Sequence, residues 1–104
     1  MLRRSRFRDV VTRQLDLFAA DEADLLDEAE EADAAWTSAD RDETEERFGD
    51  YQLVADAIGE RLYDAREAYA STLEDGAADE YRHAFNAAAL RRFRRFAGFL
   101  EEDA

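Results

Sequence analysis

The 104-residue chain contains no cysteine, no proline and no lysine, and it has only four glycines. Without cysteine, disulfide bonds, thiol catalysis and cysteine-ligated zinc are excluded. Without proline and with little glycine, few residues can interrupt a helix. No apolar run approaches the ~20 residues that a membrane-spanning helix requires. These absences favour a helical chain that does not cross a membrane.

The charged residues are strongly unbalanced. The chain has 27 acidic and 14 basic residues, all of the latter arginine, for a formal net charge of −13. Phosphate backbones and anionic lipid surfaces repel such a chain as a whole, so we expect neither nucleic acid nor a membrane as partner. No apolar core of a secretory signal is present, so we expect a cytoplasmic protein, and a salt-adapted cytoplasm would also explain the acidity.

Apolar residues recur at alternating steps of three and four, the spacing of a helix with one buried face. We predict helices over residues 5–36, 41–73 and 78–101, with Gly76 in a left-handed conformation just past the end of the second. The predicted core stripes comprise Val11, Leu15, Phe18, Leu25, Ala29, Ala32 and Trp36, then Phe48, Tyr51, Ala55, Ile58, Leu62, Ala65 and Tyr69, and finally Tyr81, Phe85, Ala89, Phe93, Phe96 and Leu100.

Short connections between long helices favour antiparallel neighbours. The predicted fold is therefore all-α, an antiparallel up-down-up three-helix bundle with two long helices and a shorter C-terminal helix, in a single domain of residues 1–104. The charges agree with this topology. It places the arginines of residues 91–95 beside the acids of residues 27–33, and those of residues 3–8 beside the acids of residues 74–80.

Glu22 and Arg92 are charged residues on otherwise apolar stripes. A carboxylate alone on a packed face would be costly, and a guanidinium is its best partner. Counted at 1.5 Å per residue from the predicted helix starts, the two lie within about 6 Å of the same level. We therefore expect Glu22 and Arg92 to form an ion pair between the first and third helices.

The segment Glu80-Tyr81-Arg82-His83 resembles the Glu-x-x-His pattern of ferritin-like di-iron proteins, which places a carboxylate and an imidazole on one helix face. Those sites also need a glutamate from another helix, for which Glu22 is the candidate, and a two-fold dimer would supply two such sets. However, His83 lies about 140° from the centre of its apolar stripe and is expected to face water. Our first expectation is therefore that the chain binds no metal or cofactor.

An exposed histidine on a small helical bundle also resembles a histidine-phosphotransfer domain. Those domains usually carry a Lys-Gly pair shortly after the histidine, whereas His83 is followed by Ala84-Phe85-Asn86-Ala87-Ala88. Phosphotransfer through His83 is the second alternative.

No serine-histidine-aspartate pattern, phosphate-binding glycine loop or dinucleotide fingerprint is present. We therefore expect a non-enzymatic helical interaction or scaffold protein that self-associates. Apolar residues that flank the stripes or lie off them are the candidate interface positions, because a contiguous apolar patch would mark a partner surface. They are Val10, Leu17, Leu53, Tyr63 and Leu90.

If these residues pack against a two-fold copy, the chain forms a homodimer. Light scattering at high micromolar concentration should then give twice the chain mass of 11.9 kDa. A monomer mass under those conditions would contradict self-association.

Overall fold

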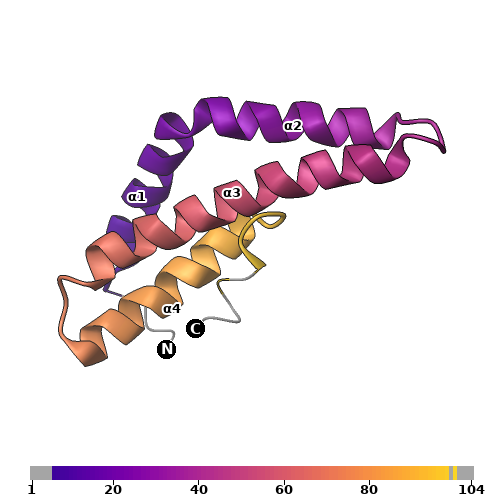
Figure 1. Cartoon of the computed structure of the whole chain (residues 1–104). Coiled ribbons are helices and arrows are strands. Elements are labelled where there is room, and N and C mark those ends of the chain that lie inside the picture. Colours follow the sequence, from indigo (N-terminus) through magenta and orange to yellow (C-terminus); the bar gives the residue numbers. More distant parts are fainter. Residues whose placement is uncertain (1–5, 99, 101–104) are drawn as a thin grey trace.

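The structure is a computed structural model that describes residues 6–98 and 100. Within these residues every regular element is helical, so the predicted all-α class is confirmed, but four helices replace the predicted three (Figure 1). The helices are α1 (Arg8–Asp21), α2 (Ala23–Thr37), α3 (Thr44–Ala70) and α4 (Asp75–Arg92).

The predicted first helix is divided by a bend at Glu22. The backbone of Glu22, with φ −105° and ψ 23°, departs from helical geometry, and α2 leaves in a new direction (Figure 1). Backbone hydrogen bonds continue through the bend, since the amides of Glu22 and Leu26 each bond to the carbonyl four residues earlier. The apolar stripe predicted for residues 5–36 therefore packs against two different helices, because α1 packs mainly along α4 whereas α2 packs along α3.

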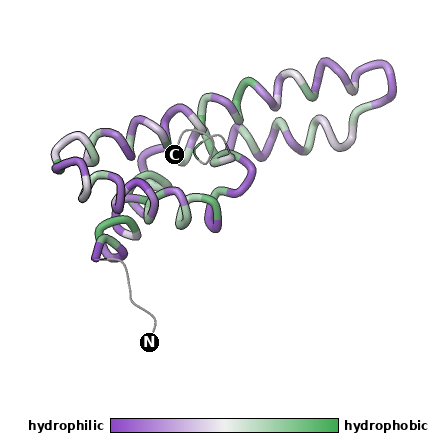
Figure 2. The backbone as a smooth tube through the Cα atoms, turned by 90° about the horizontal axis from the view of Figure 1, so that it is seen from below, coloured by the Kyte–Doolittle hydropathy of each residue, from purple (hydrophilic) through white to green (hydrophobic). Residues whose placement is uncertain are grey.

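Figure 1 shows α2 and the first half of α3 as an antiparallel hairpin, and Figure 2 shows the same hairpin extending away from the other helices. We call residues 23–55 the arm. The remaining helices, namely α1, residues 56–70 and α4, form the body. The hairpin makes the molecule elongated, with extents of 51 × 29 × 25 Å.

Two aromatic groups hold α1 against α4 in the body. At one end, the Phe7 and Tyr81 rings meet edge to face at 5.6 Å, and the Tyr69 ring of α3 lies 4.7 Å from Tyr81. At the other end, the Phe18 and Phe93 rings meet edge to face at 5.5 Å. The body therefore contains most of the buried core. Of the stripe residues predicted on the arm only Ala29 is buried, and Leu25, Ala32, Trp36, Tyr51 and Ala55 are only partly so.

The C-terminal part of the third predicted helix differs from the expectation. Helix α4 ends at Arg92, and Phe93, with φ −126° and ψ 49°, begins a turn. The turn folds the chain back so that Phe93, Phe96 and Leu100 are all buried. Phe99 and Glu101, which were also assigned to this helix, lie outside the described residues.

The prediction for Gly76 is wrong. Helix α3 ends at Ala70, and Gly76 lies in the first turn of α4. Among the described residues no glycine has a positive φ. The chain instead turns through residues 71–74, where the Thr72 hydroxyl bonds to a carbonyl of the last turn of α3 at 2.7 Å.

The predicted charge layout is confirmed only for Arg95 and Arg6; Arg92 pairs with Asp16 instead, and Arg8 and Arg91 form no ion pair with a described residue. Arg95 bonds to Glu30 and to Asp33, the latter at 3.2 Å, and Arg6 bonds to Glu80 at 3.1 Å. Arg3 and Arg4 lie outside the described residues. The Arg6–Glu80 pair at the start of the two helices and the Arg92–Asp16 pair near their ends show that α1 and α4 run in the same direction.

The body contains a buried arginine. Arg66 of α3 is only 1% exposed; its Nε bonds to Glu67 at 2.8 Å and its Nη1 to the Asn86 side-chain oxygen at 3.0 Å. Its guanidinium also lies 4.9 Å from the Tyr63 ring centre. The Asn86 amide in turn donates to the Leu100 carbonyl at 3.1 Å. One network thus connects α3, α4 and the C-terminal turn.

Glu67 extends this network to the surface. Arg82 of α4 donates to both of its carboxylate oxygens, at 3.0 and 2.9 Å. The hydrogen bond from Arg82, reinforced by Arg66, holds the pKa of the Glu67 carboxyl below its ordinary value of 4.5 despite partial burial. The ionised carboxylate is therefore favoured in the folded protein.

Replacing Glu67 with glutamine should lower the free energy of unfolding by about 1–2 kcal/mol at pH 7, because two arginines lose an ionic acceptor. The folded-state pKa lies below the unfolded one, so this stabilisation is present above the ordinary pKa of 4.5 and fades as the pH falls through the folded value.

Urea unfolding of the wild type and Glu67→Gln between pH 7 and pH 3 tests this. The difference should be largest near neutrality and shrink below pH 4.5. Glu60→Gln, an exposed acid on the same helix, is the control and should show little difference at any pH. A difference for Glu67→Gln that does not vary with pH would contradict the role assigned to its carboxylate.

Candidate functional site

The residues considered for a metal site lie apart within one chain. Glu22, at the bend, accepts two hydrogen bonds from Arg61, whereas Glu80 on α4 bonds to Arg6. His83 is exposed on α4, as its helical phase predicted. Within residues 6–98 and 100, no three acidic or histidine side chains are grouped to hold a metal ion. The dimeric arrangement of the same residues stays a prediction.

The predicted pairing of Glu22 with Arg92 is wrong. Arg92 bonds to Asp16, and Glu22 bonds to Arg61 at 3.1 Å. The cross-pairs between α1 and α4 join residues 74 and 76 positions apart, so the position level with Glu22 falls beyond the end of α4. The Glu22 side chain therefore bonds to Arg61 of α3 instead.

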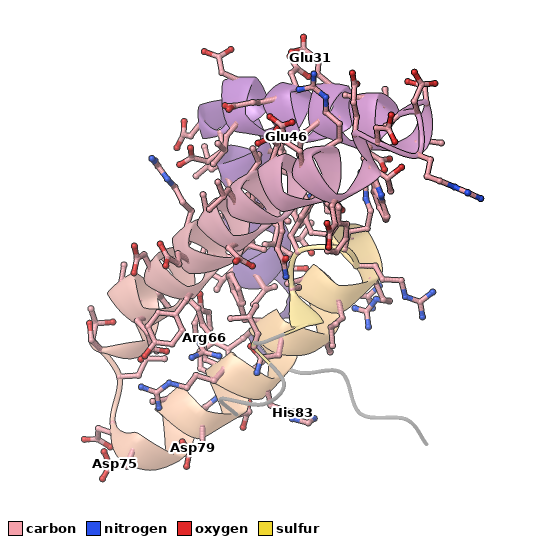
Figure 3. The ribbon with its side chains drawn as sticks, turned by 45° about the vertical axis from the view of Figure 1, so that its right-hand side comes forward. Glu31, Glu46, Arg66, Asp75, Asp79 and His83 are labelled. Carbon is pink, nitrogen blue, oxygen red and sulfur yellow. The ribbon has the colours of Figure 1, made fainter. Side chains whose placement is uncertain are left out.

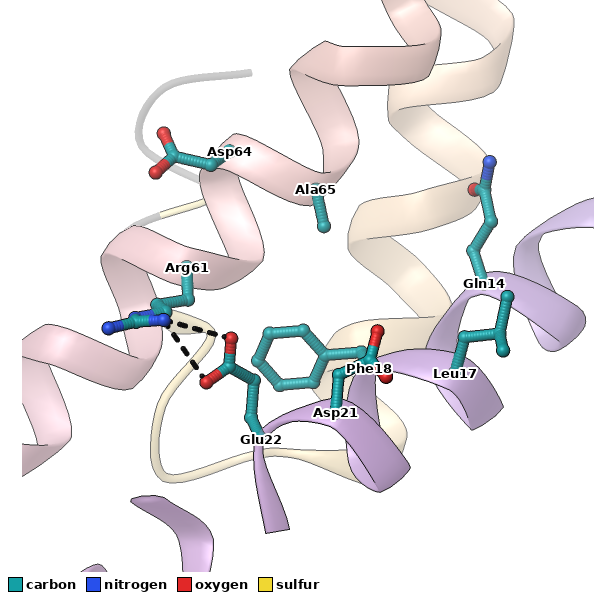
Figure 4. Close-up of a pocket in the computed structure, with 8 residues that line it drawn as sticks. All are labelled: Gln14, Leu17, Phe18, Asp21, Glu22, Arg61, Asp64 and Ala65. Atoms are coloured by element: carbon teal, nitrogen blue, oxygen red, sulfur yellow. Dashed lines mark hydrogen bonds and ion pairs between the residues drawn. The ribbon is translucent and has the colours of Figure 1, made fainter. Parts of the chain in front are cut away.

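A crevice of about 380 Å³ lies between α1 and α3 beside this ion pair. Figure 4 shows Glu22 and Arg61 bridging the two helices next to the Phe18 ring. Asp21 and Asp64 add two more carboxylates to the lining. The ion pair joins α1 and α3 at the place where the chain bends into the arm.

The five predicted interface residues fall into two groups. Val10, Tyr63 and Leu90 are half-buried and pack against the core, which leaves little of them for a partner. Leu17 and Leu53 are 57% and 72% exposed. Only these two are free to meet a partner.

Phe48 is a surface residue that the sequence pattern assigned to the core. Its position fits the stripe of the second helix, but its side chain is 40% exposed. It lies on the arm, where it contacts Trp36 at 4.7 Å between ring centres; Tyr51 stacks on the same Trp36 at 5.6 Å. The period of a helix shows which face is apolar but not whether another helix covers that face.

The arm carries most of the net negative charge of the chain. Residues 23–55 contain twelve acids and two arginines, a formal charge of −10 out of −13 for the whole chain. Figure 3 shows acidic side chains, Glu31 and Glu46 among them, on the surface of the hairpin. The candidate functional surface is therefore an acidic arm with an aromatic cluster formed by Trp36, Phe48 and Tyr51.

Comparison with known proteins found no matching family, no matching curated protein and no matching solved structure. Among the described residues, no helix has both the length and the apolar composition that crossing a membrane requires. Function is therefore inferred from the residues of this chain alone.

A double-mutant cycle distinguishes the observed partner of Glu22 from the predicted one. The variants Glu22→Gln and Arg61→Ala should show a coupling energy of about 0.2–1 kcal/mol, since the Arg61 side chain is 57% exposed. Glu22→Gln and Arg92→Ala should be additive. Coupling to Arg92 but not to Arg61 would contradict the observed geometry.

Proposed function

We propose that this chain is a non-enzymatic helical interaction protein whose arm binds a positively charged segment of a partner protein. The observation that carries the proposal is the concentration of charge, a formal −10, on a hairpin that projects from the body. Like charges gathered on one element repel one another, and a basic partner relieves that repulsion.

Most of these carboxylates have no ionic partner among the residues that the structure describes. Arg95 engages Glu30 and Asp33, and Arg47 engages Glu43 and Asp50. The other eight acids of the arm form no ion pair with any residue in the described part of the chain. They are Asp24, Asp27, Glu28, Glu31, Asp40, Asp42, Glu45 and Glu46. A partner with several arginines or lysines therefore finds unpaired carboxylates on both helices of the arm.

The aromatic cluster adds an apolar anchor to this acidic surface. Phe48 is 40% exposed beside Trp36 and Tyr51, both of which are only half-buried. Aromatic faces attract guanidinium and ammonium groups, and they also receive apolar side chains. An amphipathic, arginine- or lysine-rich helix presents both kinds of group, so it is the partner chemistry that best fits the arm.

The homodimer expected from the sequence meets an electrostatic cost if it forms through the arms. Two arms side by side would bring two formal charges of −10 together. The repulsion is screened over about 8 Å at physiological salt and about 3 Å at 1 M. Arm-to-arm association should therefore strengthen with added salt, whereas binding of a basic segment should weaken.

Trp36 is the only tryptophan and lies in the aromatic cluster, so its fluorescence reports directly on the arm. Titration with an amphipathic, arginine-rich helical peptide should change the Trp36 emission saturably, with weaker binding at 500 mM than at 50 mM salt. Phe48→Ala and the triple variant Glu31→Gln/Glu45→Gln/Glu46→Gln should each weaken binding by about tenfold.

Two matched variants serve as controls. Asp56→Asn/Glu60→Gln/Asp64→Asn removes three exposed charges from α3 outside the arm, and Leu53→Ala removes an exposed apolar side chain from a different face of the same helix. Neither should weaken binding more than twofold. Equal losses from both triple variants would show attraction by net charge alone. Dimerisation that becomes tighter with added salt, together with no peptide binding, would show that the arm binds a second copy of the chain. Either result contradicts the proposal.

A further inference from the structure

A groove between α1 and α4 is lined by basic residues although the chain is acidic. It encloses about 560 Å³, and its polar lining consists of Arg8, Thr12, His83 and Arg91. Its floor is apolar and made of small side chains, namely Val11, Ala84, Ala87 and Ala88. None of the acids among the described residues lines it, whereas the crevice in Figure 4 is lined by three carboxylates.

Several acids close to the groove along α1 and α4 are engaged by other arginines, whereas Asp9, next to Arg8, forms no ion pair with a described residue. Glu80 bonds to Arg6, Asp79 lies 3.5 Å from Arg82, and Asp16 bonds to Arg92. Arg8 and Arg91 form no ion pair with any of residues 6–98 or 100. Their charges therefore remain available to an anion from solution.

The register of the two helices sets the dimensions of the groove. The cross-pairs join residues 74 and 76 positions apart, so Arg8 lies nearly level with His83. Arg91 lies two helical turns further along α4, about 12 Å away at 1.5 Å per residue. Figure 3 shows His83 projecting from α4 toward solvent. Cationic or polar groups thus stand at both ends of a short apolar floor.

We propose that this groove binds a small organic phosphate monoester. Guanidinium groups donate paired hydrogen bonds to phosphate oxygens, and an imidazole can donate another. The alanines and Val11 leave room for a compact apolar body beside a phosphate held by Arg8 and His83. The site lies on the body rather than on the arm, and it does not depend on the protein partner proposed above.

His83 is the only histidine, so its ring proton signals in NMR spectra are unambiguous. Titration of the full chain with phenyl phosphate should shift these signals saturably. Inorganic phosphate, which lacks the apolar body, should bind at least about tenfold more weakly, and phenol, which lacks the charge, should not shift them. Arg8→Ala should weaken phenyl phosphate binding by about tenfold, whereas Arg91→Ala, about 12 Å away at the other end of the floor, should weaken it less.

Arg13→Ala is the matched control. Arg13 also lies on α1 and has no ion pair with a described residue, but it does not line the groove. Ala87→Leu, which fills the floor, should weaken phenyl phosphate more than inorganic phosphate, and circular dichroism melting of each variant verifies folding. An unchanged His83 signal, equal affinity for both phosphates, or an Arg13→Ala effect as large as that of Arg8→Ala would each overturn the proposal.

Discussion

The structure of the body depends on how the buried charge of Arg66 is stabilised. A guanidinium removed from water is costly unless its donors are satisfied, and Arg66 is almost fully buried. Glu67 supplies the opposite charge, Asn86 supplies a neutral acceptor, and the Tyr63 ring covers one face. Because Asn86 also holds the Leu100 carbonyl, accommodating this arginine fixes the position of the C-terminal turn.

The arm has the opposite character. Its helices are held by their contact with each other and by a few aromatic rings, while its charges point into solvent (Figure 3). The body and the arm therefore differ in how their charged residues are used. The body is specified by buried polar contacts and core packing, and the arm is left with surface that the fold itself does not use.

The helical period was sufficient to predict the all-α class and most of the core, since Val11, Leu15, Phe18, Ile58, Leu62, Tyr81 and Phe85 are all buried as expected. The bend at Glu22 was not predictable, because no glycine or proline marks it and its hydrogen bonds continue. The bend arises because α1 and α2 pack on different helices. Such a competition between tertiary neighbours leaves no local signal in the sequence.

The candidate surfaces show the same limit. The sequence showed the net charge of the chain, but nothing in the periodicity indicated that the acids would gather on a projecting hairpin or that Phe48 would be 40% exposed. Arg66 was missed although a signal existed, since it lies four residues from both Leu62 and Ala70 and hence on the buried side of α3. For this residue the neighbours at helical spacing were a better guide to burial than its charge.

The connectivity also bears on the order in which the chain folds. Helices α2 and α3 are joined by a six-residue connection, so their contact closes a short loop. The contacts of α1 with α4 join residues 74 and 76 positions apart, and they form only after most of the chain is present. During synthesis the two helices of the arm can therefore pack together first. The apolar stripe of α1 stays exposed to solvent until α4 has been synthesised.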